Sequence, residues 1–376
     1  MPGLSRIAVG TIQPGAESRT ILWALFEALR QAGVQVQSFH SRASDPGGEG
    51  AARVTGLPPR HLDSWLMSPQ RCRELFVRGS EGADLALVEG PFDAAIGTQP
   101  VGGRLETLCQ WLSLPRIVVL DAAQLDRRGL PERPEHVDGL FLDGVFDSRH
   151  LARLATDLEA LWSVPVLGAL ERLPRFRSRL EAAARGERIP RRLSEELGQH
   201  FLGYWDPDGL WQLATGRQFP RGPRPASAES AMAKLTVAVA YDEAFHGYFQ
   251  DTLDQLELWG ATLVDFSPLR DESLPPNVDL VYLGCGHPER YAAALSENHC
   301  MKASLRSHLA AGRRIYGEGG GAAYLCQHLE TADGGWKRMV GILPAAARRK
   351  PAAAPMPVEV TLSRGNWLGE PASRLR

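Results

Sequence analysis

Short apolar segments alternate with amphipathic stretches through the first half of the chain. Residues 7–9 form an apolar run that predicts a strand. In residues 18–32 apolar side chains recur at helical spacing, which predicts a helix with one apolar face made of Ile21, Leu22, Leu25 and Leu29. Further strands are predicted at residues 34–39, 84–89, 116–121, 137–142 and 164–170. Strands separated by helix-length segments are typical of βαβ units, so we predict an α/β domain with a mostly parallel sheet.

The pattern is interrupted at residues 217–233, which are rich in Pro, Gly, Ser, Ala and Arg and have no periodicity. It then resumes with predicted helices at 245–259 and 291–311 and with predicted strands at 236–240, 262–266, 280–283 and 314–316. We therefore predict two α/β domains, residues 1–216 and 234–376, joined by the linker 217–233.

Composition and charge narrow the class of protein. The formal net charge is −2, whereas a dedicated nucleic-acid binder is usually clearly basic. The chain shows no signal-peptide pattern and no apolar run of the roughly 18 residues that a membrane span needs. The five cysteines include no C-x-x-C pair, which favours reduced thiols. We expect a soluble, cytoplasmic protein without a nucleic-acid or membrane partner.

Six segments carry specific motifs: V-A-V-A-Y-D-E-A-F (237–245), F-S-P-L-R-D-E-S-L-P (266–275), Y-L-G-C-G-H-P-E (282–289), I-Y-G-E-G-G-G-A-A-Y-L (315–325), T-G-L-P-P-R-H-L-D-S-W-L-M (55–67) and P-V-L-G-A-L (165–170). In these segments the chain resembles one known family, the cobyrinic acid a,c-diamide synthases, and the first four keep the family's order and spacing. The resemblance implies a P-loop amide-ligase domain followed by a class I glutamine amidotransferase-like, flavodoxin-like domain. It also implies an ATP-dependent reaction that amidates the a and c carboxylates of a corrin-type tetrapyrrole with ammonia from glutamine.

The glutaminase part of the family pattern lacks its nucleophile. The family places a Cys in the motif E-C-G-G, and this chain has E-G-G-G, with Gly319 in the nucleophile slot. Glycine has no side chain that could form the thioester of glutamine hydrolysis. Cys326 is expected on the following helix, and Cys285 is interpreted as a small buried residue in a tight turn, with proximity to the site as the alternative. The family's catalytic His is expected beyond residue 376, so we expect no glutaminase activity.

The phosphate-binding loop also departs from the family's G-T-x-S-G-x-G-K-T-T. The corresponding stretch reads G-T-I-Q-P-G-A-E-S-R-T and begins at Gly10. Two alignments place Ser18 or Glu17 where the family has its Lys, and the first domain contains no lysine. Arg19 is then the only nearby cation that we expect. Because such loops hold phosphate by backbone N–H groups and a fixed positive charge, we expect at most weak ATP and Mg²⁺ binding. The remnants of the nucleotide site would be Gly15, Ser18, Arg19 and Thr20.

Two acidic residues in the first domain are candidate Mg²⁺ ligands. Glu89 ends a predicted strand where the family has a Glu of its metal–nucleotide site. Asp45 lies in the stretch that corresponds to the family's K-x-G-P-D-Y-I-D-P, here shortened and without the Lys. The alternative is that both are ordinary solvated carboxylates.

Four further residues are candidates for a ligand cleft. His61 and Asp63 are two positions apart on an extended segment, so both side chains can face one side; helix capping is the alternative for Asp63. Asp242 and Glu243 follow the predicted strand 236–240 at a carboxyl end, where α/β proteins bind ligands. The alternative for this pair is the acidic start of a helix.

Three functional hypotheses follow from these departures. The first is a non-catalytic homologue that binds a tetrapyrrole or a partner protein. The second is an ATP-dependent amide ligase that uses free ammonia or a partner's glutaminase. The third is a subunit that scaffolds an active paralogue. An oligomer is compatible with each of them.

Overall fold

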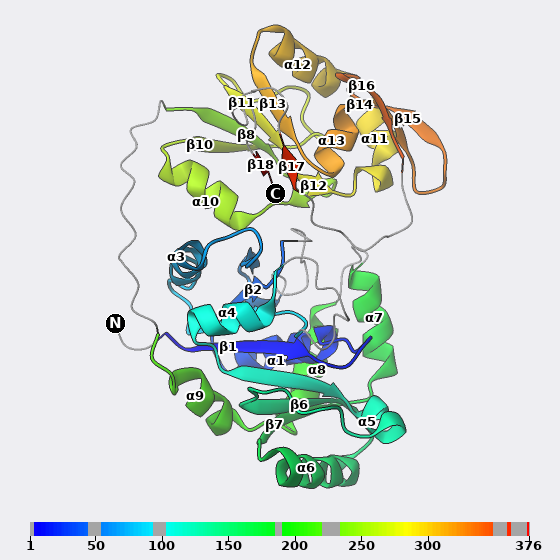
Figure 1. Cartoon of the computed structure of the whole chain (residues 1–376). Helices are drawn as coiled ribbons and strands as arrows, with labels where there is room; N and C mark the ends of the chain where they lie inside the picture. The colour runs from blue at the N-terminus through cyan, green and yellow to red at the C-terminus, as the bar shows by residue number, and fades with distance from the viewer. Residues whose placement is uncertain are drawn as a thin grey trace. The chain divides into compact units, whose positions relative to one another are not determined.

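A computed structural model describes residues 4–43, 54–92, 103–184, 190–219, 234–348, 359–361 and 374–375. The chain divides into two compact units, and the division after the first unit falls between residues 224 and 225, within the predicted linker. The described residues up to 219 belong to the first unit, and residues 234–348 belong to the second (Figure 1). Residues 359–361 and 374–375 are grouped with the first unit. No helix in the described ranges is long and apolar enough to cross a membrane.

The described part of the first unit contains a seven-stranded sheet in the order β3-β2-β4-β1-β5-β6-β7, with every neighbouring pair parallel. The strands are β1 (Arg6–Thr11), β2 (Val36–His40), β3 (Arg60–His61), β4 (Leu85–Glu89), β5 (Arg116–Asp121), β6 (Gly139–Val145) and β7 (Val166–Glu171). This confirms the predicted parallel α/β domain. Because all strands run the same way, their carboxyl ends lie along one edge of the sheet, where ligand sites of such folds form.

Helices cover both faces of this sheet, so its strands are apolar on both sides. One face packs against α3 (Pro69–Gly79), α4 (Leu105–Leu112), α5 (Ala122–Arg128) and α6 (Ser148–Trp162). The other face packs against α1 (Arg19–Gln31), α7 (Pro174–Ala184), α8 (Arg191–Leu202) and α9 (Pro207–Thr215). Along β1 the side chains alternate between these two layers, with Ala8 in the first and Ile7 and Val9 in the second.

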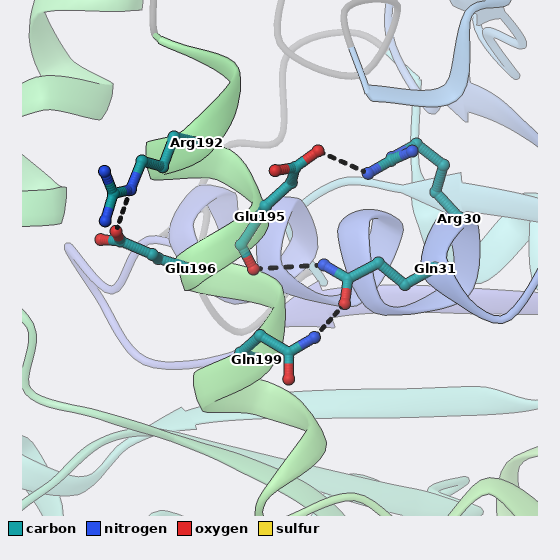
Figure 2. A pocket seen from close by; sticks show the side chains of 6 residues that line it. All are labelled: Arg30, Gln31, Arg192, Glu195, Glu196 and Gln199. Carbon is teal, nitrogen blue, oxygen red and sulfur yellow. Dashed lines mark hydrogen bonds and ion pairs between the residues drawn. The ribbon is translucent and has the colours of Figure 1, made fainter.

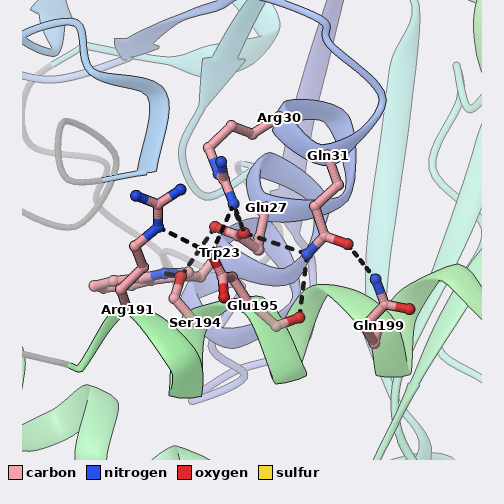
Figure 3. Close-up of polar contacts among 8 residues, drawn as sticks. All are labelled: Trp23, Glu27, Arg30, Gln31, Arg191, Ser194, Glu195 and Gln199. Atoms are coloured by element: carbon pink, nitrogen blue, oxygen red, sulfur yellow. Dashed lines mark hydrogen bonds and ion pairs between the residues drawn. The ribbon is translucent and has the colours of Figure 1, made fainter.

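A buried carboxylate ties α8 to α1 (Figure 3). Glu27 of α1 is 2% exposed and accepts hydrogen bonds from Arg30 Nη2 at 2.5 Å and Ser194 Oγ at 3.1 Å. Trp23 Nε1 donates to Ser194 Oγ at 3.0 Å. Burial alone would raise the pKa of Glu27, but the hydrogen bonds from Arg30, Gln31 and Ser194 outweigh it and lower that pKa. The network explains how a charged residue lies in the apolar interface of two helices.

A polar pocket of about 440 Å³ lies beside this network, between α1 and α8 (Figure 2). Its walls carry only charged and amide side chains: Arg30, Gln31, Arg192, Glu195, Glu196 and Gln199. Several of these already pair with each other, as Arg192 Nε does with Glu196 Oε1 at 3.3 Å. None of the candidate site residues of the sequence analysis is among those that line this pocket.

The second unit has a four-stranded parallel sheet in the order β10-β8-β11-β13, within the residues described. Its strands are β8 (Thr236–Ala240), β10 (Thr262–Phe266), β11 (Leu280–Leu283) and β13 (Arg314–Gly317). A two-stranded sheet contains β9 (Phe245–Gly247) and β12 (Cys285–Gly286). A three-stranded sheet contains β14 (Cys326–Glu330), β15 (Trp336–Arg338) and β16 (Leu343–Ala347). The helical segments are α10 (Gln250–Leu258), η2 (Pro288–Arg290), α11 (Ala292–Glu297), α12 (His299–Ala310) and α13 (Gly320–Leu325). Two short strands, β17 (Val360–Thr361) and β18 (Arg374–Leu375), pair with each other.

Three sequence predictions are wrong in this unit. The predicted helix 245–259 starts only at Gln250, because residues 245–247 pair with β12 as strand β9. The predicted helix 291–311 breaks at Asn298, whose side chain accepts a hydrogen bond from Met301 N at 3.1 Å and so caps α12. Cys326 does not lie within α13 but begins β14.

Candidate functional site

A tight strand-to-helix turn occupies the nucleophile slot of the second unit. β13 ends at Gly317 and α13 begins at Gly320, with Glu318 and Gly319 between them; we call residues 317–321 the elbow. Gly319 has φ 50° and ψ −117°, a conformation that strains any residue with a side chain. Such a strained turn is how a nucleophile is exposed at the end of a strand in related architectures. The chain therefore has the shape of a nucleophile turn, with a glycine at its strained position.

Cys285 faces this turn. A Cβ atom placed on Gly319 would lie 2.6 Å from Cys285 Sγ and 3.5 Å from Cys285 Cβ. The thiol of Cys285 thus takes up space that a side chain at position 319 would need. The interpretation of Cys285 as only a small residue in a tight turn is incomplete, because it is half-buried and beside the elbow. Cys326, in contrast, is buried, and burial raises the pKa of its thiol, which disfavours a thiolate.

Glu318 of the elbow is held by two tyrosines from neighbouring strands. Tyr282 Oη donates to Glu318 Oε1 at 2.6 Å, and Tyr316 Oη donates to Glu318 Oε2 at 3.2 Å. Burial raises the pKa of Tyr316 to about 12, and the charge of Glu318 adds to the shift. Burial and Glu318 also raise the pKa of Tyr282. Both phenols stay protonated at neutral pH, so they remain donors that fix the carboxylate.

Asp242, the first residue of the acidic pair that follows β8, has a structural function. Asp242 is 7% exposed and accepts hydrogen bonds from Ala244 N at 2.8 Å, Ser267 Oγ at 2.8 Å and Leu269 N at 3.0 Å. Glu243 is exposed and pairs with Arg270 at 2.6 Å. Asp242 therefore organises two loops at the carboxyl end of β8. It does not start a helix, because strand β9 follows.

The loop between β1 and α1 and the first turn of α1 carry the four residues that the sequence analysis assigns to the remnants of a nucleotide site. Gly15 has φ +72°, and Ser18 is the N-cap residue of α1 although its side chain makes no capping hydrogen bond. Gln13 is 5% exposed, and its Oε1 accepts from Asp121 N at 2.6 Å. Gln13 thus ties this loop to β5, and Arg19 is exposed.

The prediction that Arg19 is the only nearby cation is wrong. Arg177, on α7, brings Nη1 to 3.5 Å from Thr20 Oγ1 at the start of α1. Its Nη2 lies 2.5 Å from Asp143 Oδ1 on β6. These residues are 157 and 34 positions apart, respectively, from Arg177. Only the order of strands in the sheet brings them together, so no local motif could have found Arg177.

Glu89, the candidate metal ligand on β4, lies beside His40 of the neighbouring strand β2. In the sheet His40 is the register partner of both Glu89 and His61. His40 Nδ1 is 3.3 Å from Glu89 Oε1, and the rings of His40 and His61 are 5.1 Å apart. The proposed partner Asp45 lies outside the described residues. Within the described ranges, no three His, Cys, Asp or Glu side chains are placed to hold a metal ion.

Asp63, one of the candidate cleft residues, shapes the turn that follows β3. It accepts hydrogen bonds from Ala43 N at 3.0 Å, Trp65 N at 2.9 Å and Leu66 N at 3.3 Å. His61 is 3% exposed. Asp63 is thus committed to backbone groups, as a capping residue would be, although no helix begins there.

The fold and these two sites define a class: a parallel α/β unit with a phosphate-loop-like turn, followed by an amidotransferase-like unit with an elbow. Residues 236–356 match the family model of the CobB/CobQ-like glutamine amidotransferase domain. Cobyrinate a,c-diamide synthase of Syntrophotalea carbinolica is 31% identical over 359 residues, which cover 91% of this chain and 78% of that protein. The enzyme of the same name from Dehalococcoides mccartyi strain CBDB1 is 32% identical over 361 residues, covering 90% and 77%. The chain belongs to the cobyrinate a,c-diamide synthase family.

Among solved structures, the MinD cell division protein of Aquifex aeolicus is similar to 57% of this chain and 99% of that one. The identity is 13% and the TM-score 0.35.

Proposed function

We propose that this chain is a non-catalytic member of the cobyrinate a,c-diamide synthase family that binds a tetrapyrrole or a partner protein. The observation that carries the proposal is the elbow, where Gly319 offers no nucleophile and Cys285 Sγ takes up the adjoining space. Glutamine hydrolysis of this type needs a thiolate on the turn and a base to activate it. The elbow keeps its shape without a side chain at position 319, which fits a fold retained for binding.

The first unit supports the same proposal. Its phosphate-loop-like turn has no lysine, and exposed Glu17 places a negative charge where phosphate would approach. A like charge at 4 Å costs about 4 kcal/mol at an intermediate dielectric. We propose at most weak binding of ATP and Mg²⁺, a cytoplasmic location, and an active paralogue as the protein partner if the ligand is a protein.

One observation favours a second candidate, an ATP-dependent amide ligase that takes free ammonia or a partner's glutaminase. Arg177 brings a guanidinium to Thr20 at the start of α1, and an arginine can bind phosphate where a lysine is missing. Glu89 also stands at the end of β4, where a metal ligand would be needed.

Three assays on the purified full chain test these functions. Glutamate release from glutamine should be absent at every substrate concentration; release that a Cys285→Ala change abolishes would show that Cys285 is a nucleophile and would refute the proposal. Titration with cobyrinic acid, followed by intrinsic tryptophan fluorescence, should show saturable binding if the ligand is a tetrapyrrole. ADP production that requires both cobyrinic acid and ammonia would instead establish the ligase.

If cobyrinic acid does not bind, the partner-protein form of the proposal is tested by mixing the chain with an active homologue and measuring the mass of the complex by light scattering. A mixture that contains only the separate proteins, together with no tetrapyrrole binding, would refute the proposal in both forms.

A further inference from the structure

Arg177 joins three elements at the carboxyl edge of the first unit's sheet. It extends from α7, forms an ion pair with Asp143 of β6, with 2.5 Å between Nη2 and Oδ1, and approaches Thr20 of α1, with 3.5 Å between Nη1 and Oγ1. Asp143 and Thr20 are 5% and 4% exposed. The guanidinium thus lies against the first turn of α1, the part of the loop that carries the remnants of the nucleotide site.

The charges around Arg177 are mostly negative. Burial alone would lower its pKa, but Asp143, Asp121 and Glu17 outweigh burial and raise that pKa. Asp121 is already committed, since its Oδ1 accepts from Ala123 N at 2.8 Å and caps α5. Burial raises the pKa of Asp143, and Arg177 opposes the shift. Asp143 is therefore the carboxylate that holds the guanidinium, and its buried charge would be costly without that partner.

A carboxylate and a phosphate bind the same fork of guanidinium N–H groups. An oxyanion that approaches Thr20 must therefore compete with Asp143 for Arg177. Asp143 belongs to the same chain and lies on a rigid strand, so it competes at a high effective concentration. A ligand that must first displace Asp143 therefore binds more weakly. Its apparent affinity is its intrinsic affinity multiplied by the fraction of molecules in which the guanidinium is free.

We propose that the Arg177–Asp143 pair is an autoinhibitory contact that closes the first turn of α1 to phosphate-containing ligands. This inference goes beyond the proposed function, because it concerns one contact in the first unit and holds whether or not the second unit has an activity. Arg177 would bind an incoming oxyanion only after Asp143 has been neutralised or moved.

The test is calorimetric titration of the full chain with ATP and Mg²⁺ at low salt. Asp143→Asn removes the competing charge and keeps the size of the side chain. The ATP affinity of this variant should be at least about tenfold higher than that of the wild type. A tenfold gain is expected if roughly nine wild-type molecules in ten have the Arg177–Asp143 pair formed. The double variant Asp143→Asn/Arg177→Met should lose this gain. Asp126→Asn is the matched control, because it breaks a different ion pair, with Arg153 at 2.6 Å, and should leave ATP affinity unchanged.

Asp143→Ser serves as a second neutral variant if Asp143→Asn does not fold, which circular dichroism will show. Affinities of the folded Asp143 variants within twofold of wild type would overturn the proposal, and so would a gain that persists without Arg177. Micromolar binding by the wild type would also overturn it, because the contact would then not inhibit. Micromolar binding by the wild type would also count against the weak ATP binding proposed above. The results on the Asp143 variants depend on neither glutamate release nor cobyrinic acid binding, so their failure is distinct from failure of the proposed function.

Discussion

Substitution of Gly319 by alanine tests whether Cys285 has closed the nucleophile turn. The new Cβ would lie 2.6 Å from Cys285 Sγ, a separation at which the thiol or the backbone must move. It would also place a side chain at φ 50°, a conformation that only glycine adopts without strain. Two separate costs are therefore expected, one from the backbone and one from the overlap.

The two costs can be estimated and then separated by a second variant. Holding a side chain in a sparsely populated backbone region costs about 1–3 kcal/mol, and overpacking a well-packed site costs about 1–3 kcal/mol more. Gly319→Ala should therefore lower the free energy of unfolding of the second unit by about 2–6 kcal/mol. Cys285→Ala removes the sulfur and leaves a Cβ at the ordinary contact distance of 3.5 Å. In that background only the backbone cost should remain, so the double-mutant cycle should give a coupling of about 1–3 kcal/mol.

The assay is urea denaturation monitored by hydrogen exchange of the peptides that cover residues 314–325. These peptides report the free energy of unfolding of the second unit by itself. Gly312→Ala is the matched control, because Gly312 has φ +79° and its added Cβ would meet no atom within 4 Å. It should show the backbone cost alone. The argument is refuted if Gly319→Ala costs no more than Gly312→Ala, or if Cys285→Ala leaves the cost of Gly319→Ala unchanged.

Three further predictions concern stability and domain organisation. Glu27→Gln should lower the free energy of unfolding by about 1–3 kcal/mol in urea denaturation. Because folding lowers the pKa of Glu27 from 4.5, the ionised carboxylate stabilises the fold above pH 4.5, and this stabilisation is lost as the pH falls through the folded-state pKa. The difference in stability between variant and wild type should therefore shrink in acid and not in alkali. Asp242→Ala leaves the backbone N–H groups of Ala244 and Leu269 and the hydroxyl of Ser267 without their acceptor and should cost about 2–4 kcal/mol. The exposed Glu243→Ala should change stability by less than about 1 kcal/mol. Limited proteolysis should cut first within residues 217–233, and first cuts inside 240–330 would contradict the predicted boundary.

Local patterns determined the elements that depend on short-range periodicity. The apolar spacing in residues 18–32 predicted α1 (Arg19–Gln31), because one face of that helix must be apolar to pack against the sheet. The predicted strand 116–121 is β5, and 236–240 is β8. The position of Gly319 in a strand-to-helix turn also followed from the motif alone. Where the predictions were wrong, as at Phe245 and Asn298, a strand partner or a capping side chain overrode the helical pattern.

The contacts that define the two sites were decided by the tertiary structure. Arg177 meets Thr20 because α7 follows β7 and packs on the same sheet face as α1, a placement set by strand order. His40 meets Glu89 because β2 and β4 are neighbours in register. Cys285 faces Gly319 because β12 and the elbow follow adjacent strands, β11 and β13. Residue types and their spacing carry the chemistry available to this chain, but parallel strands place residues far apart in sequence at one sheet edge, so only the fold decides which groups meet.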